Sequence, residues 1–183
     1  MSKKEFDIFI NAQIDKQNNE SPVDWEARRQ EWLEHISQFY TMIEFFLKEY
    51  KESGKLSYQY SQKNITEEYA GSYSVRVLDI KLGEHKVRLE PIGTIIISAT
   101  GRIDLIGANG KVKFVLVNKT YTAPSPAKVT IVSEGKQKSK DKKIEKPEKV
   151  ELAWKIATPP PRIKYIDLDQ NIFFDALLEV IGG

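Results

Sequence analysis

The chain of 183 residues contains no cysteine and only two histidines. Without cysteine it has no disulfide bond, no thiolate nucleophile and no zinc or iron–sulfur site with cysteine ligands. His35 falls on the charged side of a predicted helix and His85 in a predicted turn, so we expect both to face solvent. Zinc-protease, nucleophile-elbow, phosphate-loop and dinucleotide-binding motifs are also absent. We therefore expect neither a metal site nor a cofactor.

Long apolar runs are absent as well. No stretch approaches the roughly 18 apolar residues that a membrane-spanning helix needs. Asp7 and Asp15 interrupt the region where an export signal would require an apolar core. We expect a cytoplasmic protein with no membrane partner. The formal net charge of +2 is too small to indicate a polyanionic partner by itself.

What the chain does contain is the composition of a globular protein, with 40% hydrophobic and 30% charged residues. A domain of this length buries roughly 70% of its unfolded surface. We expect residues 1–183 to form a single domain. Residues 134–149 are rich in lysine and hold one aliphatic side chain, Ile144, so we predict a mobile loop there.

Two runs of strand-forming residues flank Asn109-Gly110 in the segment GRIDLIGANGKVKFVLVNK, residues 101–119. Asn-Gly tolerates positive φ at both central positions of a type I′ turn, which predicts a two-residue hairpin. The predicted register pairs Leu105 with Phe114. Side chains alternate between the faces of a strand, so one face is predicted to be wholly apolar: Ile103, Leu105, Val112, Phe114 and Leu116. The other face carries the charged residues Arg102, Asp104, Lys113 and Lys119.

A seven-residue period of aromatic residues gives the strongest helical signal in the chain: Trp25, Trp32, Phe39 and Phe46. Ser21 is predicted as the N-cap, with Pro22 at the first helical position. We expect the helix to cover residues 22–52 and to lie across the apolar face of a sheet. The alternative is a seam between two copies of the chain.

Alternating apolar and polar residues predict further strands near residues 56–61, 72–82, 86–90, 128–133 and 150–157, with a more apolar one at 94–98. A slip in this alternation predicts a bulge at Val77-Leu78. Pro159-Pro160-Pro161 is predicted to end the sheet.

A final helix is predicted over residues 171–181, with Asp167 or Asp169 as its cap and Gly182-Gly183 ending it. It is apolar nearly all round, so it must be buried in the fold or in a neighbour. A homo-oligomer through the 22–52 helix or this C-terminal helix is a further expectation.

Together these elements predict an α+β fold, with a curved antiparallel β-sheet of about seven strands packed against a long N-terminal helix and a short C-terminal helix. A helix-grip variant would enclose a ligand cavity between the helix and the bent sheet. Its sequence sign would be small residues opposite the helix, and the chain has too few of them to favour it.

Asp104 lies in the first strand of the predicted hairpin, and Lys119 ends the second strand on the same face. This arrangement resembles the metal-binding hairpin of the PD-(D/E)xK nucleases, in which the second strand ends in acid-x-Lys. Val117 stands where that acid belongs, and no helix is predicted directly after the hairpin. The resemblance covers residues 101–119 and implies a degenerate metal-dependent nuclease with Asp104 and Lys119 as its catalytic residues.

A nucleic-acid-binding role has support from basic side chains in the hairpin and in the lysine-rich loop: Arg102, Lys111, Lys113, Lys119, Lys138, Lys140, Lys142 and Lys143. Tyrosines 58, 60, 69 and 73 are candidates for stacking on bases. Solubilising lysines and half-exposed strand tyrosines explain the same residues without a nucleic acid.

The chain shows no coherent set of acid, base, nucleophile and metal ligands. We therefore predict a non-catalytic binding or interaction protein with a protein partner, of the accessory or immunity type in a prokaryotic system. The alternative is a nucleic-acid-binding protein or the degenerate nuclease implied by Asp104 and Lys119.

Overall fold

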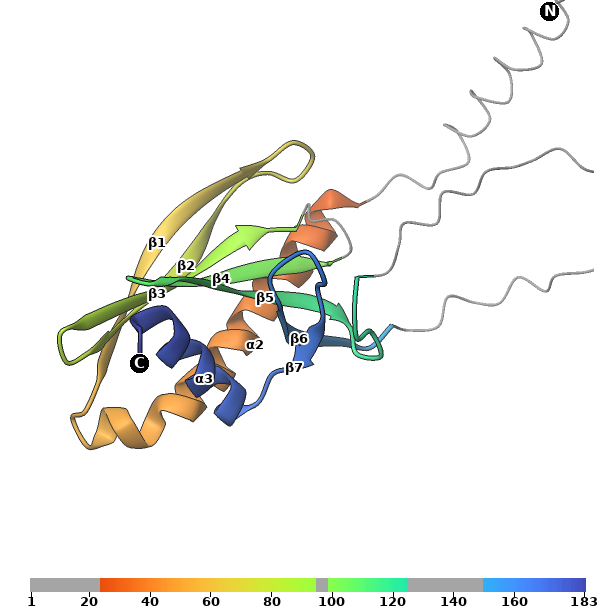
Figure 1. Ribbon diagram of the computed structural model, residues 1–183. Coiled ribbons are helices and arrows are strands. Elements are labelled where there is room, and N and C mark those ends of the chain that lie inside the picture. Colours follow the sequence, from red (N-terminus) through yellow and green to blue (C-terminus); the bar gives the residue numbers. More distant parts are fainter. Residues whose placement is uncertain (1–23, 95–98, 125–149) are drawn as a thin grey trace, which may run out of the picture.

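The computed structural model describes residues 24–94, 99–124 and 150–183. One antiparallel sheet holds seven strands, each paired with the next along the chain (Figure 1): β1 Ser57–Glu67, β2 Gly71–Leu82, β3 His85–Gly93, β4 Gly101–Gly107, β5 Gly110–Asn118, β6 Leu152–Ala157 and β7 Tyr165–Asp167. The helices are α2, Trp25–Glu52, and α3, Gln170–Ile181. The predicted α+β class, with a long helix before the sheet and a short one after it, is confirmed.

The long helix α2 begins later than predicted. Its N-cap is Asp24, whose carboxylate accepts a hydrogen bond from the backbone N–H of Ala27 at 2.9 Å. The prediction of Ser21 as the cap was wrong because Asp24 offers the same kind of acceptor one turn further on. The predicted end at Glu52 is confirmed.

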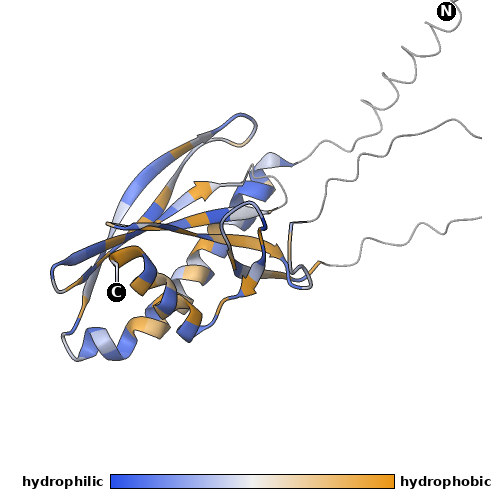
Figure 2. Ribbon diagram, viewed as in Figure 1, coloured by the Kyte–Doolittle hydropathy of each residue, from blue (hydrophilic) through white to orange (hydrophobic). Residues whose placement is uncertain are grey.

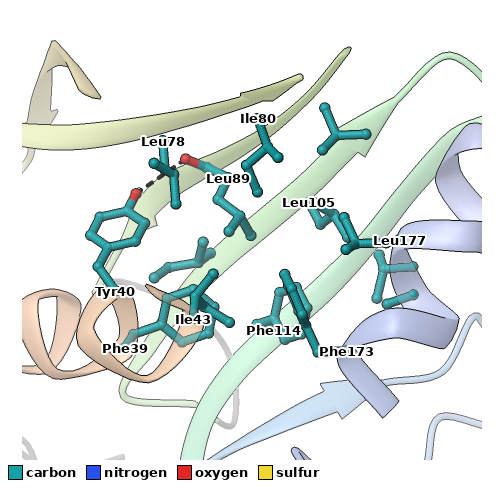
Figure 3. Packing of buried hydrophobic residues seen from close by; sticks show 14 of the residues in the cluster. Phe39, Tyr40, Ile43, Leu78, Ile80, Leu89, Leu105, Phe114, Phe173 and Leu177 are labelled. Atoms are coloured by element: carbon teal, nitrogen blue, oxygen red, sulfur yellow. Dashed lines mark hydrogen bonds between the residues drawn. The ribbon is translucent and has the colours of Figure 1, made fainter. Parts of the chain in front are cut away.

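The aromatic stripe of α2 packs on the inner face of the sheet, as predicted. Phe39 is fully buried, and its ring centroid lies 5.4 Å from that of Phe114 in β5. Phe173 of α3 packs against the same Phe114 ring, with a centroid distance of 6.3 Å. Figure 3 shows these rings within one cluster of aliphatic side chains from β2 to β5. Both helices therefore cover one face of the sheet and share one core.

Tyr40 fixes α2 to two strands through its hydroxyl group. This group donates to the backbone carbonyls of Arg76 in β2, at 2.8 Å, and Leu89 in β3, at 3.1 Å. Figure 3 shows the bond to Leu89. Burial raises the pKa of Tyr40 well above its ordinary value, because the phenolate would lose its hydration. The ring thus adds two directional bonds to an otherwise apolar contact.

The C-terminal helix α3 is held at both ends. Asp169 caps it by accepting from the N–H of Ile172 at 2.8 Å, which confirms one of the two predicted caps. Gly182 ends it in the left-handed conformation, with φ 82°. Its apolar side, with Phe173 and Leu177, is buried against the sheet of the same chain. Hydrophobic segments of α3 and the central strands lie together in Figure 2, whereas the last turns of α2 are hydrophilic.

The hairpin of β4 and β5 has the predicted faces but not the predicted register. Leu105 faces Val112, not Phe114, and Ala108 and Asn109 form the loop between the paired glycines 107 and 110. The observed partner of each β4 residue lies two positions from the predicted one in β5. Because side chains alternate with a period of two, every side chain stays on its predicted face. The cause lies in α3, because the N–H of Asn109 donates to Val180 O at 2.9 Å. A side chain at Gly107 would clash with that same carbonyl.

The bulge predicted at Val77-Leu78 was wrong. Pairing of β1 with β2 is continuous, and the register shift falls between Pro91 and Gly93 of β3 instead. Proline cannot donate to the ladder and Gly93 has φ 147°, so this is where pairing with β4 breaks most readily. Before Leu78, residues 71–77 of strand β2 pair with β1 alone, and such two-stranded ribbons twist more strongly.

Several predictions lie wholly or partly outside the described residues, among them the strands at 94–98 and 128–133 and the loop at 134–149. Strand β7 was not predicted, because its three residues are too few to show an alternation. Neither helix in the described ranges is long and apolar enough to cross a membrane.

Gly101 provides a test of how closely α2 packs on β4. A Cβ at this position would fall inside the van der Waals radius of the Trp32 ring. We expect Gly101→Ala to lower the free energy of unfolding by about 1–3 kcal/mol, as measured by urea denaturation. In a Trp32→Leu background the same substitution should cost clearly less. An equal cost in both backgrounds would show that the ring does not set the limit.

Candidate functional site

The outer face of the sheet, opposite the helices, holds the charged residues that the sequence singled out. Asp104 is buried there, and its two carboxylate oxygens accept from Nε and Nη2 of Arg102, each at 2.6 Å. Lys111 Nζ lies 3.7 Å from the same carboxylate. The hydrogen bonds that Arg102 donates to Asp104 raise the pKa of the Arg102 guanidinium above its ordinary value. Asp104 is therefore the centre of an ion-pair cluster.

The strand neighbours of Asp104 continue this pattern. Glu90 of β3 stands opposite Asp104 on one side and Lys113 of β5 on the other. Glu90 forms an ion pair with Lys63 of β1. A second carboxylate thus lies beside Asp104, but no group of three potential metal ligands occurs within residues 24–94, 99–124 and 150–183.

Lys119, the partner required by the nuclease resemblance, lies elsewhere. Strand β5 ends at Asn118, and Lys119 pairs with Glu151 at 2.9 Å. Lys113 is the residue opposite Asp104, and Lys119 comes six residues later, which is about 20 Å along an extended chain. The structure therefore does not bring Asp104 and Lys119 together.

Those predicted nucleic-acid residues that the structure describes lie in two places. Arg102, Lys111 and Lys113 surround Asp104, and Lys119 lies at the far end of β5. The four loop lysines, Lys138, Lys140, Lys142 and Lys143, fall outside the described residues.

The candidate stacking tyrosines are largely occupied by contacts within the chain. Tyr60 donates to Glu44 and Tyr73 to Glu67, each at 2.6 Å, and burial raises the pKa of both rings above the ordinary value. Tyr58 packs against the core cluster. Tyr69 is more exposed and stacks on Trp25, with ring centroids 5.1 Å apart.

A buried lysine marks the end of the outer face near β7. Lys155 of β6 is only 3% exposed, and its Nζ donates to Tyr121 O at 2.9 Å and pairs with Asp167 at 2.8 Å. Val115 and Tyr165 belong to a small apolar cluster on this face. Lys155 thus ties the segment after β5 to the end of the sheet.

An apolar recess of about 420 Å³ opens where β6 leaves β5. Pairing of these two strands stops at Lys113 and Ala157, and the N–H of Thr158 turns away to donate to Lys164 O. The next three residues are prolines, of which the first two line the recess. Because proline has no N–H, this segment is unsuited to continue the ladder along β5.

The walls of the recess come from elements far apart in the sequence. Its apolar lining comes from the ends of β5 to β7, the turn between β6 and β7, and one side of α3: Val112, Ile156, Ala157, Pro159, Pro160, Ile163, Ile166, Ile172 and Ala176. Lys111 and Lys113 border it on the sheet side, and Asp175 and Glu179 on the helix side. Ile166 is 41% exposed.

Sequence reasoning missed this recess although it found one of its causes. The three prolines were predicted to end the sheet. Strand β6 does end before them, at Ala157, but β7 follows in the same sheet, so that prediction was wrong. Nothing local shows that β6 pairs with β5 or that α3 stands beside them. Strand β7, Tyr165–Asp167, is too short to show an alternation, so it gave no signal for the remaining wall.

The chain matches no protein-family model, and comparisons with curated proteins and with solved structures find no match. The site is therefore interpreted from its own geometry.

The role of Asp104 can be tested by removing its charge. Asp104→Asn removes the bidentate partner of Arg102, and we expect the free energy of unfolding to fall by about 1–3 kcal/mol. The loss is limited because Arg102 is partly exposed and water can solvate its charge. Asp79→Asn is the matched control, because Asp79 pairs with Arg88 at a more exposed position on the same face. Its cost should stay below about 1 kcal/mol. Equal costs in chemical denaturation would contradict the central role of Asp104.

Proposed function

We propose that this chain is a non-catalytic binding protein and that the recess between α3 and the ends of β5 to β7 receives part of a protein partner. The observation that carries the proposal is the recess itself. Its volume lies in the range of roughly 300–1,000 Å³ that is typical of ligand sites. Its lining is mostly apolar, with charged residues of both signs at its border.

The described charges on the outer face support binding over catalysis. The carboxylate oxygens of Asp104 are engaged by Arg102, and Lys119 and Lys155 each have an acidic partner. Charges paired in this way stabilise a surface and align the strands beneath it. An accessory or immunity-type role in a prokaryotic cytoplasm stays a prediction.

The recess can be tested with random peptides displayed on phage and selected on the purified full chain. We expect selected peptides to lose binding to Ile166→Glu, because a carboxylate in the apolar wall must be desolvated by any occupant. Phe45→Glu is the matched control, since Phe45 is 72% exposed on α2 and does not line the recess. Binding should be measured by interferometry, with circular dichroism to show that both variants are folded. Peptides that bind both variants equally well, or a selection without enrichment, would contradict the proposal.

The second candidate, nucleic-acid binding, has support from the exposure of Lys111 and Lys119, whose side chains are 53% and 59% exposed. A gel shift with single- and double-stranded DNA and RNA tests it. Phosphate contacts would give an affinity that falls steeply as salt is raised. Unchanged mobility at low salt would remove this candidate. Cleavage that requires Mg²⁺ and is lost in Asp104→Asn would instead favour the nuclease alternative.

A further inference from the structure

The open edge of β5 borders the recess. On one side β5 pairs with β4 down to Gly110, and on the other it pairs with β6 only from Lys113 onwards. In the part of the chain that the structure describes, no strand pairs with Gly110–Val112 on this second side. An uncovered edge presents backbone N–H and C=O groups that can pair with another extended chain.

The neighbouring elements leave room for such a chain. The segment after Ala157 folds back on itself, since Thr158 Oγ1 donates to Arg162 O and accepts from the N–H of Lys164. It therefore flanks the open edge without covering it. The opposite flank is α3, whose Ile172 and Ala176 present an apolar surface to the recess.

We propose that the occupant of the recess is an extended peptide segment that adds to the sheet at Gly110–Val112, antiparallel to β5 and in line with β6. This inference rests on the proposed function and specifies the chemistry of the partner. Main-chain hydrogen bonds supply affinity in this mode of recognition, and alternate side chains supply specificity.

The two sides of the added strand meet different surroundings. A residue opposite Val112 points inward, towards Ile156 and the apolar side of α3, so an aliphatic side chain fits there. A residue opposite Lys111 points outward, to the charged face. Lys111 is about half exposed and 3.7 Å from Asp104, so its ammonium group can also meet an incoming carboxylate. The preferred segment therefore alternates aliphatic and acidic residues.

The probe for this inference is the peptide acetyl-Thr-Val-Glu-Val-Thr-amide. Amide chemical shifts of the ¹⁵N-labelled full chain report its binding site and its affinity. We expect the largest shifts at Gly110–Lys113 and at Ala176.

Two N-methylated forms of the peptide distinguish edge pairing from apolar contact. Successive N–H groups of a strand point to opposite sides, so methylation of both valines blocks one edge and methylation of the glutamate blocks the other. Pairing with β5 predicts that only one of these forms loses affinity, by about fivefold or more. Equal affinities for all three peptides would overturn the strand addition.

Charge reversal tests the outward position. Replacing the glutamate of the peptide by lysine should weaken binding several-fold at low salt, and Lys111→Glu should reverse that preference. Lys119→Glu is the control, because Lys119 lies at the far end of β5 and should leave the preference unchanged. If Lys111→Glu leaves the preference for glutamate intact, the assignment of the acidic position is wrong.

The outcomes separate the two proposals. Peptide binding that is lost in Ile166→Glu but unaffected by either N-methylation keeps the recess as a binding site and overturns strand addition. The fatty acid dodecanoate is a second probe. If it changes the amide chemical shifts of residues around the recess and the peptide does not, the ligand is a small amphipathic molecule, and strand addition is overturned. Failure of the peptide, the phage selection and dodecanoate alike would remove both proposals.

Discussion

The packing of Phe114 between Phe39 of α2 and Phe173 of α3 is the contact on which the rest of the fold depends. Phe114 stands in β5, and both helices meet the sheet at this strand, so their apolar sides share one core. Removal of the Phe114 ring would leave a cavity at the point where both helices meet the sheet. Phe46 and Phe173 would then be the direct contact between the helices, with ring centroids 6.0 Å apart. The position of α3 in turn creates the helix wall of the recess.

The two faces of the sheet are stabilised by different forces. On the inner face, burial of aliphatic and aromatic area dominates, and Tyr40 adds two hydrogen bonds that depend on direction. On the outer face, ion pairs are arranged around Asp104 and Lys155. Buried pairs of this kind contribute little net stability, but the loss of one partner leaves a charge without compensation. They therefore favour one arrangement of the strands over others.

Sequence patterns predicted those features that depend on neighbouring residues. The apolar face of the β4–β5 hairpin, the end of α2 at Glu52 and the cap at Asp169 all follow from local periodicity or capping. The register of the hairpin did not, because a contact with Val180 of α3 selects it. The recess was missed for the same reason: it is formed by three segments that meet only in the folded chain. The charged residues were identified. The Arg102–Asp104 pair is local, since the two residues lie two apart on one strand, whereas the pairs Lys63–Glu90 and Lys119–Glu151 join residues far apart in the sequence that no local signal connects.

The order of elements along the chain has a consequence for the kinetics of folding. Strands β1 to β5 follow one another closely along the chain and each pairs with the next, so this part of the sheet can grow by successive short-range steps, whereas β6 joins β5 only after residues 119–151. Closure of the helical layer is different, since the side chain of Gln170 in α3 donates to Phe46 O of α2 across a separation of 124 residues. Formation of this contact has a large entropic cost of loop closure until the strands have paired and have brought α2 and α3 close together. We therefore expect α3 to dock late in folding, and until then the part of the apolar side of β5 that α3 covers is exposed to solvent, which favours aggregation.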